Sequence, residues 1–201
     1  MPETPVGALV RLLDVTPADG DLLDQLRATQ AGGFNDLGQE RKRLPPDAWV
    51  DGHLRGEIRG ELFVERRADR RIVGTISYHR VSYGPNPKSA AWMIGIDLVP
   101  EGRGQGLGTE AQRLLADWLF ETTETNRVEA STDVENHAEA RALEKAGFRR
   151  EGVNRGAQFR AGAYHDLVLY ARLRSDPATT RARPSAEGFR LSRRGGGARG
   201  G

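Results

Sequence analysis

Apolar and polar residues alternate in several short stretches of this chain and repeat every three to four positions in others. Alternation is typical of strands, and the longer period is typical of amphipathic helices. The clearest helical stretch carries apolar residues at i, i+3, i+4, i+7 and i+8, namely Ala111, Leu114, Leu115, Trp118 and Leu119. Since strand-like and helix-like stretches follow one another along the chain, the pattern predicts a mixed α/β domain.

The predicted elements cover most of the first 174 residues. Strands are expected at residues 6–14, 61–65, 71–83, 89–99, 127–132, 151–159 and 163–173. One helix is expected to start at Thr16 with Pro17 in its first turn, and another follows residues 103–108. A helix is also expected to open at Pro45 and run through Leu54, and the last to start at Asn136 and end at Gly147.

Length and charge predict one domain with a tail. The chain has 201 residues, which is the size of a single domain. Residues 1–174 are expected to fold, whereas residues 175–201, rich in Arg, Gly and Ser, are expected to be disordered. The tail has six arginines against Asp176 and Glu187, and a solvated extension is favoured over a nucleic-acid role.

The amino-acid composition excludes several kinds of catalytic and metal site. The chain contains no cysteine, which excludes disulfides, thiolate metal sites and an acyl-cysteine intermediate. Its four histidines are scattered along the sequence, so no metal site is expected. No apolar stretch approaches about 18 residues, and no signal peptide is evident, so we expect a cytoplasmic protein without a membrane partner.

The segment Arg103-Gly104-Gln105-Gly106-Leu107-Gly108 stands between a predicted strand and the clearest helix. Glycines at alternate positions leave the turn uncrowded and tolerate positive φ. Backbone N–H groups of such a loop, together with a helix N-terminus, can point at an anion. The spacing fits neither the dinucleotide fingerprint nor the nucleotide P-loop. A diphosphate is the expected occupant, and an ordinary glycine-rich turn is the alternative.

A second motif covers residues 131–148 and ends in Glu144-Lys145-Ala146-Gly147-Phe148. Asn136 and Glu139 have the spacing of a helix-capping box, and Gly147 suits the position just after a helix. Together with Arg-x-x-Gly-x-Gly at residue 103, this motif resembles the GNAT superfamily of acyltransferases. Residues 94–96, 108–111, 151–152 and 162–166 make the chain similar to the ribosomal-protein N-terminal acetyltransferase branch.

The resemblance implies a GNAT fold and an acyl donor. The expected fold is a central, mostly antiparallel sheet of about seven strands, splayed between the fourth and fifth strands and flanked by about four helices. Acetyl-CoA is expected to lie in that cleft without a metal. The resemblance implies that Leu98, Val99 and Asn136 hold the pantetheine arm. The pyrophosphate is expected to meet the amides of Arg103, Gly104, Gln105, Gly106, Leu107 and Gly108, and Thr109 is a further donor-binding position.

No acid–base pair follows from the resemblance. Many GNAT enzymes have a Tyr four residues before the position of Gly147, where this chain has Leu143, and the resembling branch often has Ser at the position of Glu139. Glu139, Asp133 and Tyr164 are the candidates for proton relay through water.

Three further side chains are expected to be structural. Alternation along the last strand places His165 with Leu167 and Leu169, which predicts a packed histidine rather than a catalyst. Trp92 and Tyr78 are expected to belong to the core rather than to line the acceptor cleft.

Direct transfer of an acetyl group from acetyl-CoA to a primary amine is the expected activity. An α-amino group has a pKa of about 7.7–8.0, so its neutral form is available near neutrality, whereas a Lys amine at about 10.4 needs more help. The acceptor is either a protein N-terminus or a small-molecule amine. A non-catalytic acyl-CoA-binding regulatory module is the alternative function, and a homodimer is left open.

Overall fold

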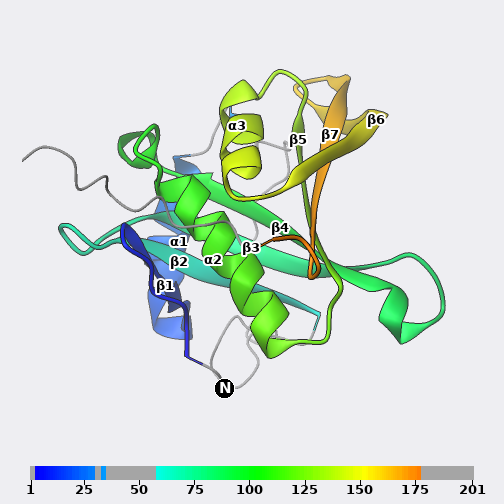
Figure 1. Ribbon diagram of the computed structural model, residues 1–201. Helices are drawn as coiled ribbons and strands as arrows, with labels where there is room; N and C mark the ends of the chain where they lie inside the picture. Colours follow the sequence, from blue (N-terminus) through cyan, green and yellow to red (C-terminus); the bar gives the residue numbers. More distant parts are fainter. Residues whose placement is uncertain (1–2, 30–32, 35–57, 178–201) are drawn as a thin grey trace, which may run out of the picture.

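The computed structural model describes residues 3–29, 33–34 and 58–177. In this part of the chain seven strands form one sheet, in the order β1-β2-β3-β4-β5-β7-β6 (Figure 1). The strands are β1 Val10–Asp14, β2 Arg59–Arg66, β3 Arg71–Ser82, β4 Ala90–Leu98, β5 Arg127–Asp133, β6 Arg149–Arg160 and β7 Ala163–Leu173. The helices are α1 Gly20–Ala28, α2 Leu107–Thr122 and α3 His137–Lys145. The predicted mixed α/β class and seven-stranded sheet are confirmed, whereas the helix expected at 45–54 and most of the tail, residues 178–201, lie outside the described residues.

The first strand is shorter than predicted because a carboxylate takes its leading amides. The backbone N–H groups of Ala8, Leu9 and Val10 donate to the Glu110 carboxylate at 2.9, 2.6 and 2.8 Å. This segment therefore turns toward α2, and only Val10–Asp14 pairs with β2. The helix expected at Thr16 likewise begins as a 3-10 turn over Pro17–Asp19 before α1.

The sheet is splayed in its middle, as predicted. Neighbouring strands pair antiparallel except β4 and β5, which run parallel. These two strands pair only over Trp92–Ile94 and Val128–Ala130, although β4 continues to Leu98 and β5 to Asp133. Beyond that short ladder, no residue of β4 pairs with a residue of β5, which shows that the two strands diverge there.

Helices cover both faces of the sheet. The larger core joins one face of the strands to buried side chains of α2 and α3, including Leu115 and Leu143. The smaller core packs Leu23 and Leu26 of α1 on the other face, against Phe63. Figure 1 shows α2 in front of the sheet and α1 behind it.

Trp92 and Tyr78 lie in the larger core, as predicted. Their exposed fractions are 7% and 4%, and their rings meet edge to face with centroids 5.2 Å apart. Tyr78 also contacts the ring of Trp118 on α2. Both residues therefore support the sheet from the side of α2.

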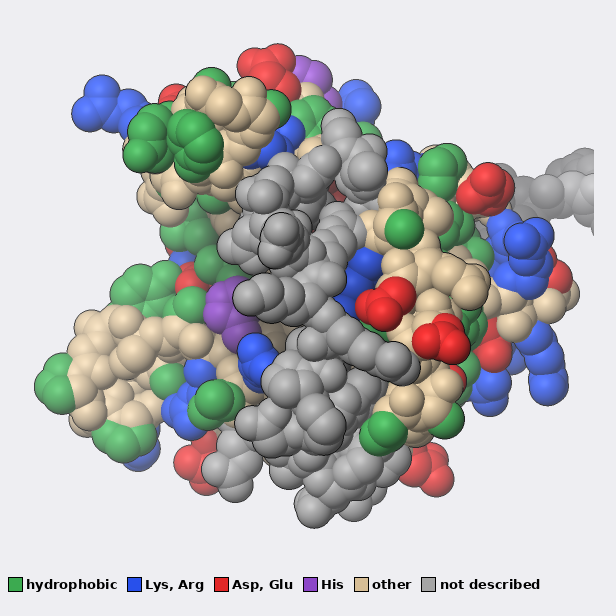
Figure 2. Space-filling model, turned by 180° about the vertical axis from the view of Figure 1, so that it is seen from behind, with side chains coloured by type: hydrophobic (Ala, Val, Ile, Leu, Met, Phe, Trp, Pro, Cys, Tyr) green, Lys and Arg blue, Asp and Glu red, His purple; other side chains and the backbone are tan. Residues whose placement is uncertain are grey.

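The β6–β7 hairpin presents an exposed aromatic pair. Figure 2 shows hydrophobic side chains gathered over this hairpin, at the upper left of that view. Phe159 and Tyr164 pair across the two strands, with ring centroids 5.2 Å apart, and both are largely exposed. Elsewhere, no helix among the residues described is long and apolar enough to cross a membrane.

Candidate active site

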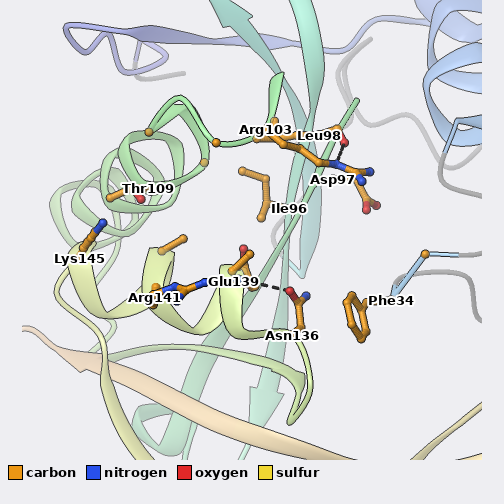
Figure 3. A pocket seen from close by; sticks show the side chains of 16 residues that line it. Phe34, Ile96, Asp97, Leu98, Arg103, Thr109, Asn136, Glu139, Arg141 and Lys145 are labelled. Carbon is orange, nitrogen blue, oxygen red and sulfur yellow. Dashed lines mark hydrogen bonds between the residues drawn. The ribbon is translucent and has the colours of Figure 1, made fainter. Parts of the chain in front are cut away.

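A cavity of about 630 Å³ opens where β4 and β5 diverge. Its walls come from the end of β4, the loop before α2, the inward face of α3, and Phe34 with its neighbour Gly33 (Figure 3). The lining residues are Gly33, Phe34, Ile96, Asp97, Leu98, Arg103, Gly104, Gly106, Gly108, Thr109, Asn136, Ala138, Glu139, Arg141, Ala142 and Lys145. The two motifs found in the sequence therefore face one another across a single cavity.

The glycine loop places the N-terminus of α2 at this cavity, and no side chain at the N-cap position caps that terminus. Gly104 and Gly106 have φ of 72° and 78°, the left-handed region that favours glycine. Gly106 is the N-cap of α2, and no side chain there accepts from the first helical amides. A Cβ on Gly104 would meet nothing within 4 Å, so a side chain at that position would stand in open cavity space. Unpaired amides at the positive end of a helix are suited to a phosphate group.

Most of the predicted donor-binding residues line this cavity. They are Leu98, Arg103, Gly104, Gly106, Gly108, Thr109 and Asn136. The other three lie nearby with their own contacts. Leu107 is buried in the larger core, the Gln105 amide donates to the Glu101 carbonyl, and the Val99 N–H donates to the carbonyl of Val73 at 2.9 Å.

The Arg103 side chain folds back over the end of β4. Its Nε donates to the Leu98 carbonyl oxygen at 2.9 Å, and Figure 3 shows it close to Asp97. The guanidinium therefore lies at the cavity wall, beside the strand end that the resemblance assigns to the pantetheine arm.

Two cations on α3 were missed by the sequence reasoning. Arg141 and Lys145 line the cavity together with Ala138 and Ala142. Ala138, Arg141, Ala142 and Lys145 are spaced i, i+3, i+4 and i+7, so the periodicity of α3 contained the signal. Phe34 was also missed, and its position in a stretch without regular periodicity gave no local signal.

The ends of α3 follow the predicted capping rules with one difference. Asn136 Oδ1 accepts from the Glu139 N–H at 3.3 Å, and the helix ends with Phe148 N–H donating to the Leu143 carbonyl at 3.0 Å. The reciprocal half of the predicted capping box is not formed, because the Asn136 N–H donates to the Asp133 carbonyl instead. The Glu139 carboxylate is therefore not bound to the helix start, and it lines the cavity.

Burial changes the acidity of Glu139. Desolvation raises the pKa of this carboxyl from its ordinary value of 4.5 to about 7, and the negative charge of Asp97 contributes to the rise. The nearby side-chain amide of Gln112 opposes this rise in the pKa. A carboxyl with such a pKa can hold and release a proton near neutral pH.

The three predicted relay residues are not brought together. Among them only Glu139 lines the cavity. Asp133 is 4% exposed and ion-paired with Arg160, and its Oδ1 accepts from the Glu135 N–H. Tyr164 is 74% exposed on the β6–β7 hairpin.

His165 is packed, as predicted, with both ring nitrogens engaged. Nδ1 lies 3.2 Å from Arg160 Nη2, and Nε2 lies 3.2 Å from the Arg160 carbonyl oxygen. Nδ1 also lies 3.2 Å from Asp133 Oδ2, so the ring is held by contacts at both nitrogens.

This arrangement places an uncapped helix N-terminus next to a polar cleft in a splayed sheet. Within the described residues, no group of three or more His, Asp or Glu side chains is placed to hold a metal. Such a site fits an acyltransferase that uses a phosphorylated thioester donor.

The chain belongs to the GNAT acetyltransferase family: the acetyltransferase (GNAT) domain model matches residues 10–149. The protein is thus an acyltransferase of the N-acetyltransferase type. It is 28% identical over 176 residues to the probable N-acetyltransferase YjcK of Bacillus subtilis (strain 168), a match that covers 83% of this chain and 94% of that protein. It is 31% identical over 126 residues to the ribosomal-protein-serine acetyltransferase of Escherichia coli (strain K12), covering 62% and 68% of the two chains.

A solved structure shows the same fold. The ribosomal L7/L12 alpha-N-protein acetyltransferase RimL in complex with coenzyme A matches with a TM-score of 0.65 and 19% identity. The match covers 85% of this chain and 97% of that one. The predicted resemblance to the GNAT family and to ribosomal-protein acetyltransferases is confirmed.

Proposed function

We propose that this protein is an acetyl-CoA-dependent N-acetyltransferase that transfers the acetyl group directly to a primary amine. The observation that carries this proposal is the single cavity in which the uncapped N-terminus of α2 faces Asn136 and Glu139 of α3. The GNAT relatives named above support the reaction type. The RimL structure, which contains coenzyme A, supports the choice of donor.

The donor is assigned to three parts of the cavity. Backbone amides of residues 103–109 and the positive end of α2 are suited to its pyrophosphate. Arg141 and Lys145 supply positive charge to further phosphate oxygens. Asn136 and the end of β4 are suited to the amide groups of an extended pantetheine arm.

The residues around the thioester have to move two protons. In the transfer the amine nitrogen bonds to the acyl carbon, the carbon–sulfur bond breaks, the nitrogen loses a proton and the sulfur gains one. We assign to Glu139 the donation of that proton to the sulfur, because its raised pKa keeps the carboxyl partly protonated near pH 7. The amine needs less help, since an α-amino group is substantially neutral at about pH 8.

Asp133 and Tyr164 are less suited to this step. The Asp133 carboxylate accepts hydrogen bonds from Arg160 and from the Glu135 N–H, and Tyr164 lies on the exposed hairpin. We therefore place the proton relay at Glu139 and give Asp133 a positioning role.

Calorimetry of acetyl-CoA binding tests the proposal. Gly106→Glu places a carboxylate at the pyrophosphate position and should weaken acetyl-CoA binding by about tenfold or more, since a hydrogen bond to a charged group contributes about 1.5–3 kcal/mol. Gly106→Ala is the matched control, because it carries the same backbone strain at φ 78° without the charge. Equal affinities in the two variants would show that the loop does not hold the pyrophosphate.

Release of coenzyme A tests the reaction itself. A thiol-reactive dye reports only the product, because the chain has no cysteine. The acceptors to compare are N-terminal peptides, polyamines, aminoglycosides and amino-acid derivatives. Binding of acetyl-CoA without release to any of them would favour the non-catalytic module instead.

A further inference from the structure

Gln112 is a polar residue buried on α2. It is 1% exposed, whereas the other buried residues of this helix are apolar or aromatic. Burying an amide costs free energy unless the amide is hydrogen-bonded. Among the described residues, the Gln112 amide has no hydrogen-bonding partner besides the carboxyl of Glu139. A buried amide with this one partner indicates that the pair acts together.

The Gln112 amide lies at the wall of the cavity. Gln112 follows Gly108 by one helical turn, and Gly108 lines the cavity. A Cβ on Gly108 would lie 3.9 Å from Gln112 Nε2 and 3.4 Å from Leu98 Cδ1, and Leu98 lines the cavity as well. The amide nitrogen is therefore close both to the first turn of α2 and to the end of β4.

Glu139 approaches this amide from α3. Its backbone is held at the start of that helix, where its N–H donates to Asn136 Oδ1 at 3.3 Å. Figure 3 shows Glu139 among the side chains that line the cavity. The hydrogen bond of the Gln112 amide lowers the pKa of this carboxyl, against the rise that burial causes. Asn136 thus holds the backbone of Glu139, and Gln112 acts on its side chain.

Other charged side chains face the same cavity. They are Asp97 from β4, Arg103 from the glycine loop, and Arg141 and Lys145 from α3. Of these four, Asp97 acts on the pKa of Glu139, and it raises that pKa as burial does. The Gln112 amide is therefore the contribution that favours the ionised carboxyl against both.

We propose that Gln112 is a positioning residue for Glu139, and that its side-chain amide holds the carboxyl at the cavity in both protonation states. The ionised carboxylate accepts a hydrogen bond from Nε2, and the protonated carboxyl donates one to Oε1. This inference rests on the proposed function, in which Glu139 gives a proton to the sulfur and has to regain one before the next turnover. An amide suits that cycle because it carries both a donor and an acceptor.

Two variants remove the amide without adding a charge. Gln112→Met keeps an unbranched side chain of similar length, and Gln112→Leu repeats the test with a different shape, so that a packing defect in one variant can be recognised. Without its donor the carboxylate is less stable, so Glu139 should stay protonated to a higher pH. Loss of a hydrogen bond to a charged group should move the titration upward by about one pH unit. Gln25→Met on α1 is the matched control, because Gln25 is exposed.

The titration of Glu139 is measured directly by carbon NMR, on protein labelled with 13C at the glutamate carboxyl groups. The resonance of Glu139 is assigned by its absence from Glu139→Gln. Both Gln112 variants should titrate about one pH unit above wild type, and Gln25→Met should titrate like wild type. In the coenzyme A release assay, the fall in rate with rising pH should move by the same amount, while acetyl-CoA affinity stays unchanged.

The two readouts separate this inference from the proposed function. An unchanged titration of Glu139 in both Gln112 variants would refute the positioning role, and a rate lowered equally at every pH would then indicate a structural role only. A shifted titration with an unmoved pH–rate profile would uphold the contact and refute Glu139 as the acid. Absence of coenzyme A release with every amine would refute the proposed function, and the NMR titration would still decide the contact, because it needs no turnover.

Discussion

Replacement of Glu139 by glutamine should stabilise the protein at alkaline pH. The side chain keeps its shape and its place in the cavity but can no longer ionise. Because burial raises the pKa of Glu139 from 4.5 to about 7, the folded protein holds this proton over a pH range in which the unfolded chain has released it. Wild type therefore loses stability as the pH rises from about 4.5 to about 7, and Glu139→Gln avoids this loss.

The magnitude follows from the two pKa values. At about 1.4 kcal/mol per pKa unit, the difference between 4.5 and about 7 corresponds to about 3.5 kcal/mol as an upper limit. Partial exposure of the side chain to solvent reduces this figure, so we expect a gain of about 1–3 kcal/mol for Glu139→Gln above pH 8. Below pH 4.5 the ionisation contributes nothing to the difference between the two proteins.

Urea unfolding at about pH 5 and about pH 8.5 measures this effect. The advantage of Glu139→Gln over wild type should be larger at the higher pH by most of the expected gain. Glu135→Gln is the control, because Glu135 is exposed just before the same helix, and its effect should not change between the two conditions. A constant difference between wild type and Glu139→Gln at both pH values would refute the argument that burial opposes this charge.

Three further predictions concern catalysis, the N-terminal segment and donor binding. Glu139→Gln should lower kcat by about a hundredfold and remove the fall in rate as the pH rises through about 7, while acetyl-CoA affinity stays the same. A pH–rate profile equal to that of wild type would exclude Glu139 as the acid. Glu110→Gln should cost about 2 kcal/mol in urea unfolding, because the charge that accepts three backbone amides is lost, whereas Glu121→Gln on the exposed side of α2 should cost little. Replacing Arg141 and Lys145 together by glutamine should weaken acetyl-CoA binding and flatten its salt dependence; a salt dependence equal to that of wild type would exclude both cations from the phosphate site.

Local periodicity was enough to predict most of the sheet. The last predicted strand coincides with β7, Ala163–Leu173, and the seven predicted strands all occur. The strands were predicted correctly because successive side chains of a strand point to opposite faces of the sheet, so the alternation of apolar and polar residues indicates which face is buried. The capping residues of α3 were also readable from the sequence, since a cap depends on residues three or four positions apart.

Local sequence patterns predicted the ends of helices and strands less accurately where a group distant in the sequence binds the backbone N–H groups. The predicted start of β1 was too early because the Glu110 carboxylate, about a hundred positions away, takes the amides of residues 8–10. The capping box at Asn136 is incomplete for a similar reason, since the carbonyl of Asp133 accepts the N–H that Glu139 was expected to bind.

The sequence by itself determined the family, the glycine loop and the helix start at Asn136, because each depends on a short motif. Only the tertiary structure brought Phe34 to the cavity and paired Arg160 with Asp133, which lies 27 positions earlier. The acidity of Glu139 was likewise decided by the fold. Its pKa depends on how much water the surrounding helices and strands exclude from the carboxyl, and no local pattern of residues contains that quantity.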